Sequence, residues 1–202
     1  MRRVAHEQAY RGSSLAILRS SCGVGASLAG LLFVAWGYVD RPNLPIYLKD
    51  VVNFLSWAVP ALFLVGTVGL FVLCGRRVGA LGWTGLILVS SGSIWGVVDG
   101  IANIEPLYGY LTHSGVPPYL LDWLVPMLTG LTLAGVSAVE TSTSRGLGSL
   151  LLATGAFGWV YYFTDSGAIL EERPVHIAFG LLFCLGWVAL GVALLRGALQ
   201  RT

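Results

Sequence analysis

Long apolar stretches with almost no charged residues alternate with short polar segments along nearly the whole chain. A helix needs about 20 mostly apolar residues to cross the hydrocarbon core of a bilayer. Six stretches have about this length, at residues 20–39, 51–74, 78–98, 119–139, 146–164 and 175–195. The pattern predicts an all-α membrane protein built from six transmembrane helices.

The remaining segments are too short to form a separate soluble domain. We expect a basic amphipathic cytoplasmic segment at 1–19, a six-helix transmembrane domain at 20–196 and a cytoplasmic tail at 197–202. The first segment combines arginines with apolar residues and is expected to lie along the inner membrane surface. The loop at 99–118 contains prolines and turn-forming residues and is long enough to fold over the outer surface.

Arginine is distributed unevenly between the two sides of the predicted bundle. In short loops, an excess of Lys and Arg marks the cytoplasmic side. One set of segments carries most of the arginines: Arg2, Arg3, Arg11, Arg19, Arg76, Arg77, Arg145, Arg196 and Arg201. The alternate loops are mixed or acidic, so we expect both termini in the cytoplasm. Short outer loops without a disulfide pattern are typical of a prokaryotic plasma (inner) membrane protein.

The composition agrees with this class and excludes others. Hydrophobic residues make up 55% of the chain and charged residues 11%, whereas soluble domains carry about 25% charged residues. The same values exclude an intrinsically disordered chain. A net charge of +2, scattered over the chain, is too small to indicate a nucleic-acid partner.

The chain resembles itself when it is shifted by 66 residues, which aligns the second and third stretches with the fourth and fifth. Identical residues that meet include Trp57 and Trp123, Pro60 and Pro126, Gly69 and Gly135, Gly92 and Gly158, and Asp99 and Asp165. We expect three parallel two-helix repeats, an arrangement found among membrane transporters. The two matched prolines would either kink their helices at equivalent places or be inherited packing features. The alternative, that Leu- and Gly-rich helices simply align well, stays open.

Polar and aromatic residues gather at the outer ends of the predicted helices. Outward-running helices end in aspartate, with an aromatic residue one turn earlier on the same face, and inward-running helices begin with polar residues. This arrangement predicts an outward-facing pocket that binds a small molecule or an ion. The candidate ligand-binding residues are Asp40, Asp99, Asp122, Asp165, His176, Trp36, Trp95 and Tyr161.

Each of these residues also has a purely structural interpretation. Asp99 and Asp165 precede Gly or Ser and suit helix exits, and Asp122 would stabilise the start of an inward-running helix. His176 would be a hydrogen-bonding core residue, and the tryptophans would form the aromatic belt of a membrane protein.

The chain indicates no particular cofactor or metal. A transition-metal site would need His176 with two carboxylates, and calcium or magnesium would need carboxylates alone, but no spacing selects either. The Ser–Gly pairs do not form a nucleophile elbow, and the chain has no phosphate-binding loop. We therefore assign no catalytic residue.

Three functions fit this pattern. The first and favoured one is binding or transport of a small molecule or ion, without catalysis. The second is an accessory, non-catalytic subunit of a larger membrane complex, which predicts an exposed helix face of small residues. The third is a membrane-embedded enzyme that acts on a lipid or isoprenoid with a carboxylate as acid or base.

The size and topology add one resemblance. About 200 residues, six helices and both ends inside are similar to the substrate-binding subunits of bacterial vitamin uptake systems. The resemblance implies a partner membrane subunit that supplies energy.

Overall fold

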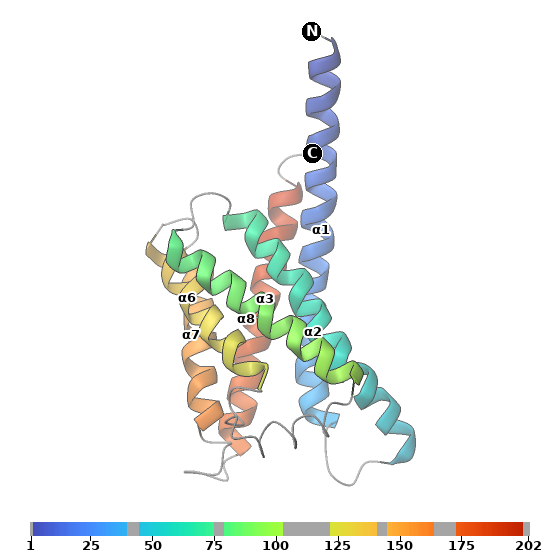
Figure 1. Cartoon of the computed structure of the whole chain (residues 1–202), viewed down its shortest axis with the longest axis vertical. Coiled ribbons are helices and arrows are strands. Elements are labelled where there is room, and N and C mark those ends of the chain that lie inside the picture. The colour runs from blue at the N-terminus through green and yellow to red at the C-terminus, as the bar shows by residue number, and fades with distance from the viewer. Residues whose placement is uncertain are drawn as a thin grey trace.

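Six α-helices make up the described part of the chain (Figure 1). The computed structural model describes residues 2–39, 45–74, 79–102, 122–140, 145–163 and 173–199, and side chains within 14–35, 48–73, 79–101, 122–140, 145–163 and 177–196. The helices are α1 (Arg2–Val39), α2 (Ile46–Cys74), α3 (Ala80–Ala102), α6 (Leu124–Glu140), α7 (Arg145–Phe163) and α8 (Arg173–Leu199). The prediction of an all-α chain with six helices is confirmed for these residues, and five of the six have membrane-spanning length.

Five of the helices, α1, α2, α3, α7 and α8, are long and apolar enough to cross a membrane. α6 is apolar but has only 17 residues, which makes it about 25 Å long against about 30 Å for the hydrocarbon core. The sequence predicts a span from residue 119, whereas the helix begins at Leu124. The start is set by Asp122, whose side chain binds the backbone N–H of Leu124.

The first helix is continuous from Arg2 to Val39, so the basic segment 2–19 and the first span belong to one element. That this segment lies along the membrane surface stays a prediction.

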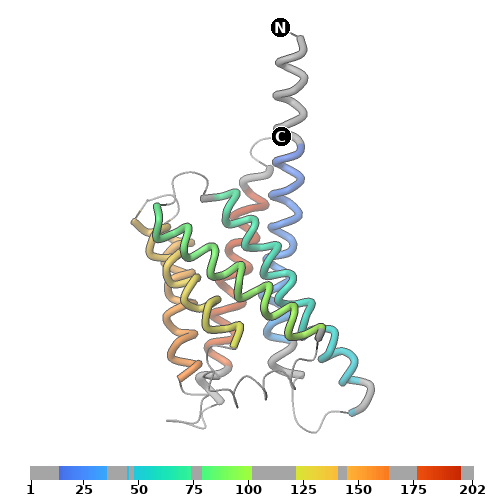
Figure 2. Tube along the Cα trace, viewed as in Figure 1, coloured from blue at the N-terminus to red at the C-terminus, as the bar shows by residue number. Residues whose placement is uncertain are grey.

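The helices form a closed ring in chain order. Each helix packs against the next one along the chain, and α8 packs against α1. Consecutive helices run in opposite directions, so α1 begins and α8 ends at the same end of the bundle (Figure 2).

The centre of the bundle is apolar and aromatic where α1, α2 and α8 meet. The ring centroids of Phe33 and Phe183 lie 4.5 Å apart, and those of Phe63 and Trp187 lie 4.7 Å apart. Phe63, Phe183 and Trp187 are almost fully buried. Buried leucines of α3, α6 and α7 continue this core along the bundle.

Large apolar side chains also cover the outside. On α3 they share one face, formed by Trp83, Ile87, Ile94, Val98 and Ile101, and Ile87 is 59% exposed. A water-soluble monomer rarely exposes so long an apolar face, whereas lipid tails provide a suitable environment for it. The outer faces of the membrane-embedded helices therefore contact lipid.

Buried hydroxyl groups are satisfied within their own helices. Thr67, Ser93 and Thr154 each donate to the carbonyl oxygen four residues earlier, at 2.8, 2.9 and 2.7 Å respectively. In an apolar bundle without water, this bond removes the cost of an unpaired donor.

The two matched prolines occupy different positions in their helices. Pro60 lies in the interior of α2, whereas Pro126 is the third residue of α6. The N–H groups of a first turn have no carbonyl partner within the helix, so proline is tolerated there without a kink. The expectation of two matched kinks is therefore wrong for Pro126.

Candidate functional site

The eight residues predicted to bind a ligand divide into two groups. Four have described side chains: Asp99, Asp122, Trp95 and Tyr161. The other four lie outside the described residues, Asp40 and Asp165 entirely and Trp36 and His176 with their side chains.

Asp99 and Asp122 come from different helices and meet at one end of the bundle. Asp99 lies in the last turn of α3 and is half-buried, and Asp122 directly precedes the first turn of α6 and is also half-buried. The charge of Asp122 acts on the carboxyl group of Asp99. The structure thus brings together two of the predicted acids.

Asp122 also has a structural task. Its Oδ1 accepts a hydrogen bond from the backbone N–H of Leu124 at 2.9 Å, and its carbonyl oxygen accepts one from Val125 at 3.2 Å. This is the geometry of an N-cap, and a negative charge there also stabilises the positive end of the helix dipole. One carboxylate oxygen of Asp122 therefore caps the start of α6, in agreement with the structural interpretation of this residue.

Glycines of α3 allow close approach to both α6 and α2 toward the end of the bundle where the two acids lie. A Cβ atom on Gly92 would lie 2.7 Å from the carbonyl oxygen of Trp123, which follows Asp122. A Cβ atom on Gly100 would lie 2.6 Å from the backbone nitrogen of Trp57 on α2. Because both distances are too short for a real Cβ atom, only glycine lets α3 approach α2 and α6 this closely.

Ser56 of α2 is a further polar group beside this pair. Its hydroxyl donates to the carbonyl oxygen of Asn53 at 2.8 Å and lies 3.5 Å from that of Gly100, next to Asp99. The sequence prediction missed Ser56. The 66-residue repeat predicted from the sequence would align Ser56 with Asp122, and that alignment is the signal that could have drawn attention to Ser56.

The two aromatic candidates occupy different places. Trp95 lies one turn before Asp99 on α3 and packs partly against the core. Tyr161 of α7 stacks on Phe179 of α8, with ring centroids 4.5 Å apart and an interplanar angle of 12°. Since α7 packs against α6 and α8, Tyr161 belongs to the contact between α7 and α8, away from the contact that holds Asp99.

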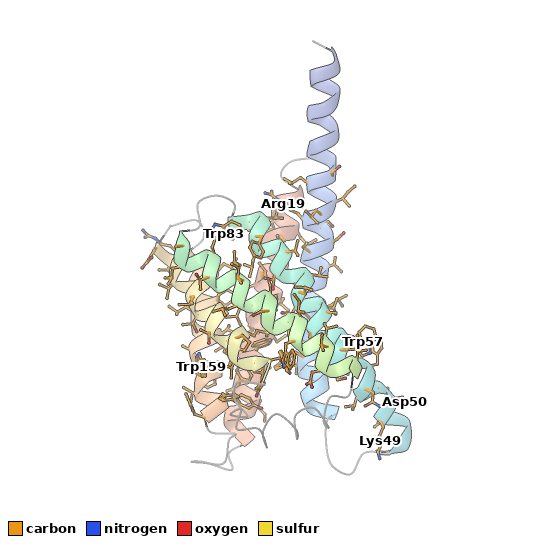
Figure 3. All side chains as sticks on the ribbon, in the orientation of Figure 1. Arg19, Lys49, Asp50, Trp57, Trp83 and Trp159 are labelled. Atoms are coloured by element: carbon orange, nitrogen blue, oxygen red, sulfur yellow. The ribbon has the colours of Figure 1, made fainter. Side chains whose placement is uncertain are left out.

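Other tryptophans lie toward the two ends of the bundle. Figure 3 shows Trp57 and Trp159 toward the end that carries Lys49 and Asp50, and Trp83 with Arg19 toward the opposite end. Trp57 and Trp83 are exposed. Tryptophans at both ends of a membrane protein are typical of aromatic belts at the headgroup level.

No group of three or more His, Cys, Asp or Glu side chains that could hold a metal ion occurs among the residues with described positions. Cys22 of α1 and Cys184 of α8 are free thiols. The acid pair alone supplies fewer carboxylate groups than a protein-built calcium site uses.

Comparison with family models, curated proteins and solved structures gives no match for this chain. Its class therefore rests on composition and fold. Five apolar helices of membrane-spanning length, with large apolar side chains on their outer faces, define a helical, multi-pass integral membrane protein.

Proposed function

We propose that this membrane protein binds a small molecule or an ion at the end of the bundle where α3 ends and α6 begins. The observation that carries the proposal is the pair of half-buried acids, Asp99 and Asp122, whose charges act on each other. Ionisable groups within membrane helices are costly and usually face the bundle interior or a cavity. A second negative charge near the first raises that cost further.

A ligand that carries a positive charge or several hydrogen-bond donors would offset this repulsion. A metal cation, an ammonium group and a polar neutral molecule all have this property. Trp123 and Trp95, which lie next to Asp122 and one turn from Asp99, would add aromatic surface. Recognition would then combine charge with stacking.

The remaining candidate residues extend the same proposal. If the three hairpins repeat, Asp40, Asp165, His176 and Trp36 join the acid pair in one pocket at this end of the bundle, and Tyr161 would border it only from the α7–α8 contact. A closed ring of consecutive helices is the arrangement expected for such a repeat. The arginine distribution supports a cytoplasmic location for both termini and so an outward-facing pocket in a plasma membrane.

Native mass spectrometry of the gently purified protein tests this function. The matched samples are the unchanged chain, an Asp99→Asn/Asp122→Asn variant and an Asp50→Asn control. Asparagine keeps the N-cap of α6 but removes the charge, and Asp50 is an exposed acid on α2.

We expect a bound ligand or metal of defined mass in the unchanged chain and in the control, and its loss from the double variant. A bare chain in all three samples, or a ligand that the double variant retains, would contradict the proposal. A lipid or isoprenoid as the bound molecule would favour the enzyme interpretation over transport.

A second candidate function, an accessory subunit of a larger membrane complex, is favoured by the outer face of α7. Its exposed residues are Arg145, Gly146, Ser149, Ala153, Ala156, Val160 and Phe163. The exposed face of α8 instead carries large side chains such as Ile177, Leu181 and Leu185. α7 is also the least apolar and the least covered of the five membrane-length helices. Small residues let a second membrane helix approach closely, so this face suits a protein partner better than lipid.

The same mass spectra test this second function through co-purifying chains. Ala153→Leu would place a bulky side chain on the small face, whereas Ala178→Leu makes the same change on the exposed face of α8. We expect Ala153→Leu to remove a co-purifying chain that Ala178→Leu retains. Equal retention in both variants, or no partner in the unchanged protein, would contradict a subunit role for α7.

A further inference from the structure

The outer face of α7 carries small side chains at positions where α3 carries large ones. Ser149, Ala153 and Ala156 are exposed and recur every three or four residues, so they form one small-residue face of the helix. On α3 the exposed positions include Ile87 and Ile94, which are 59% and 51% exposed. Ser149 and Ala153 also have the four-residue spacing of small residues that lets membrane helices approach closely. The shape of this face therefore suits a second helix.

The hydroxyl group of Ser149 differs from those on the exposed face of α3. Thr84 and Ser91 of α3 each donate a hydrogen bond to a carbonyl oxygen of their own helix, at 3.0 and 2.9 Å. The hydroxyl group of Ser149 makes no hydrogen bond within the part of the chain that the structure describes. Because a hydroxyl group both donates and accepts, two Ser149 side chains that face each other across an interface satisfy one another.

Charges of opposite sign flank the small-residue face on the two neighbouring helices. Glu140 is the last residue of α6 and Arg196 lies in the last turn of α8, and both are exposed. α7 packs against α6 and α8, and consecutive helices run in opposite directions, so both charges lie at the end of the bundle where α7 begins (Figure 1). Neither forms an ion pair with another residue in the described ranges. The face thus has a negative side along α6 and a positive side along α8.

The two charges also lie at similar depth. A Cβ atom on Gly148 of α7 would lie 2.8 Å from the nitrogen of Val139, next to the end of α6. A Cβ atom on Gly186 of α8 would lie 2.8 Å from the hydroxyl oxygen of Thr154 on α7. Counting along α7 and α8 from these contacts places Arg196 about one helical turn, roughly 5 Å, beyond the end of α6. Long side chains such as Glu and Arg extend across such an offset.

We propose that the small-residue face of α7 packs against the same face of a second copy of this chain. Copies that insert with the same orientation are related by a two-fold axis perpendicular to the membrane, so a residue on the axis faces its own counterpart. Ser149 then hydrogen-bonds to the partner's Ser149, and the α6 side of each copy lies opposite the α8 side of the other. Glu140 of each copy therefore faces the partner's Arg196. The inference rests on the proposal that this face takes a protein partner, and it identifies that partner.

A second copy fits this face better than lipid or a different chain. Lipid tails offer the Ser149 hydroxyl neither a donor nor an acceptor, whereas a second copy supplies the matching hydroxyl and both opposite charges. Close packing of the helices provides the attraction, and the flanking charges select the arrangement. Arg145, the first residue of α7, faces the partner's Arg145, but water and salt screen this repulsion because both side chains are exposed.

Disulfide crosslinking in native membranes tests the contact. Two differently tagged copies are expressed together in a background in which Cys22, Cys74 and Cys184 are replaced by alanine. Ala153→Cys places one thiol on the small-residue face, and Ala178→Cys places one on the exposed face of α8 as a control. After mild oxidation, we expect Ala153→Cys to give a reducible product of twice the mass of the chain that carries both tags. Ala178→Cys is expected to stay monomeric.

Two results would overturn the dimer. One is equal crosslinking in the two variants, or none with Ala153→Cys. The other is a different chain on this face in the native mass spectra described above, which would leave the accessory-subunit proposal intact while excluding the second copy. The ligand of the acid pair is read from the same spectra as a separate mass, so failure of the dimer does not count against the binding function.

A charge exchange tests the two-fold arrangement independently. Glu140→Arg and Arg196→Glu each turn both attractions in the dimer into repulsions, whereas the double variant restores opposite charges in exchanged positions. With Ala153→Cys as the reporter, we expect each single exchange to slow crosslinking by about fivefold, given the modest strength of exposed ion pairs. The double variant is expected to return the rate close to its starting value. A double variant as slow as the single ones, or no effect of either exchange, would contradict this arrangement.

Discussion

At the scale of single residues, Asp122 combines two roles that can be separated. Its Oδ1 holds the backbone N–H of Leu124 at 2.9 Å, while its charge acts on Asp99. Asparagine accepts the same hydrogen bond without the charge, and alanine accepts none.

Asp122→Ala is expected to lower the free energy of unfolding by about 1 kcal/mol, because α6 loses its N-cap, whereas Asp122→Asn keeps most of it. Thermal unfolding of the purified variants in detergent, followed by the helical circular dichroism signal, measures the difference. An equal loss in both variants would show that the cap contributes nothing.

The sequence predicted the residue types at this end of the bundle but not their pairing. Asp99 and Asp122 stand out as acids beside apolar stretches, which the sequence shows directly. They lie near each other because α3 packs against α6, with Gly92 against the backbone of Trp123. A close approach of this kind depends on tertiary packing, which one sequence does not reveal.

At the scale of the helices, glycines determine which neighbours can approach. Gly130 of α6 faces α3 so closely that a Cβ atom would lie 2.5 Å from the carbonyl oxygen of Gly85 and 2.6 Å from the nitrogen of Val89. Gly146, in the first turn of α7, would place its Cβ atom in open space. The same Gly→Ala substitution can therefore be compared at a crowded position and at an open one.

Gly130→Ala is expected to destabilise the bundle by about 1–3 kcal/mol, as overpacking does. Gly146→Ala is expected to be neutral or to stabilise by up to about 1 kcal/mol, because alanine favours the helix. Unfolding in detergent at increasing denaturant concentration compares them. A neutral Gly130→Ala would mean that α3 and α6 are not in backbone contact.

Apolar length was enough to predict that the helices exist, but not where each one begins. The predicted start of the fourth span differs from Leu124 because Trp123 and the residues before Asp122 are apolar and extend the stretch. Hydropathy measures only how apolar a stretch is, so it does not detect the N-cap formed by Asp122. The combination of Asp122 with a proline four residues later is itself a helix-start signal, so this boundary could have been predicted from local chemistry.

At the scale of the whole molecule, consecutive helices are neighbours and run in opposite directions. This arrangement determines which residues lie at the same end of the bundle. Alternate helices run the same way, so the end of α3 and the start of α2 lie at one end of the bundle (Figure 1). The start of α7 lies at the other. Apolar periodicity alone could not predict the closure of α8 on α1, because it does not specify which outer faces meet.

The predicted orientation is tested by single cysteines at the two ends, in the background without native cysteines. Lys49→Cys lies near the start of α2 and Arg145→Cys at the start of α7, both exposed. We expect a membrane-impermeant maleimide to label Lys49→Cys in intact cells and Arg145→Cys only after permeabilisation, because basic loops stay inside. The reverse labelling pattern would show that the bundle has the opposite orientation, with the acid pair facing the cytoplasm.

The shortness of α6 has a consequence for the bilayer around it. The 17 described residues of α6 span less than the hydrocarbon core, and local thinning of the membrane is one way in which a hydrophobic mismatch of this kind is relieved. Such thinning would draw headgroups and water inward beside α6, toward the end where Asp122 and Asp99 lie. If the acid pair is the proposed binding site, acyl-chain length would then set how deep the pair lies below the headgroups and so how a solute reaches it.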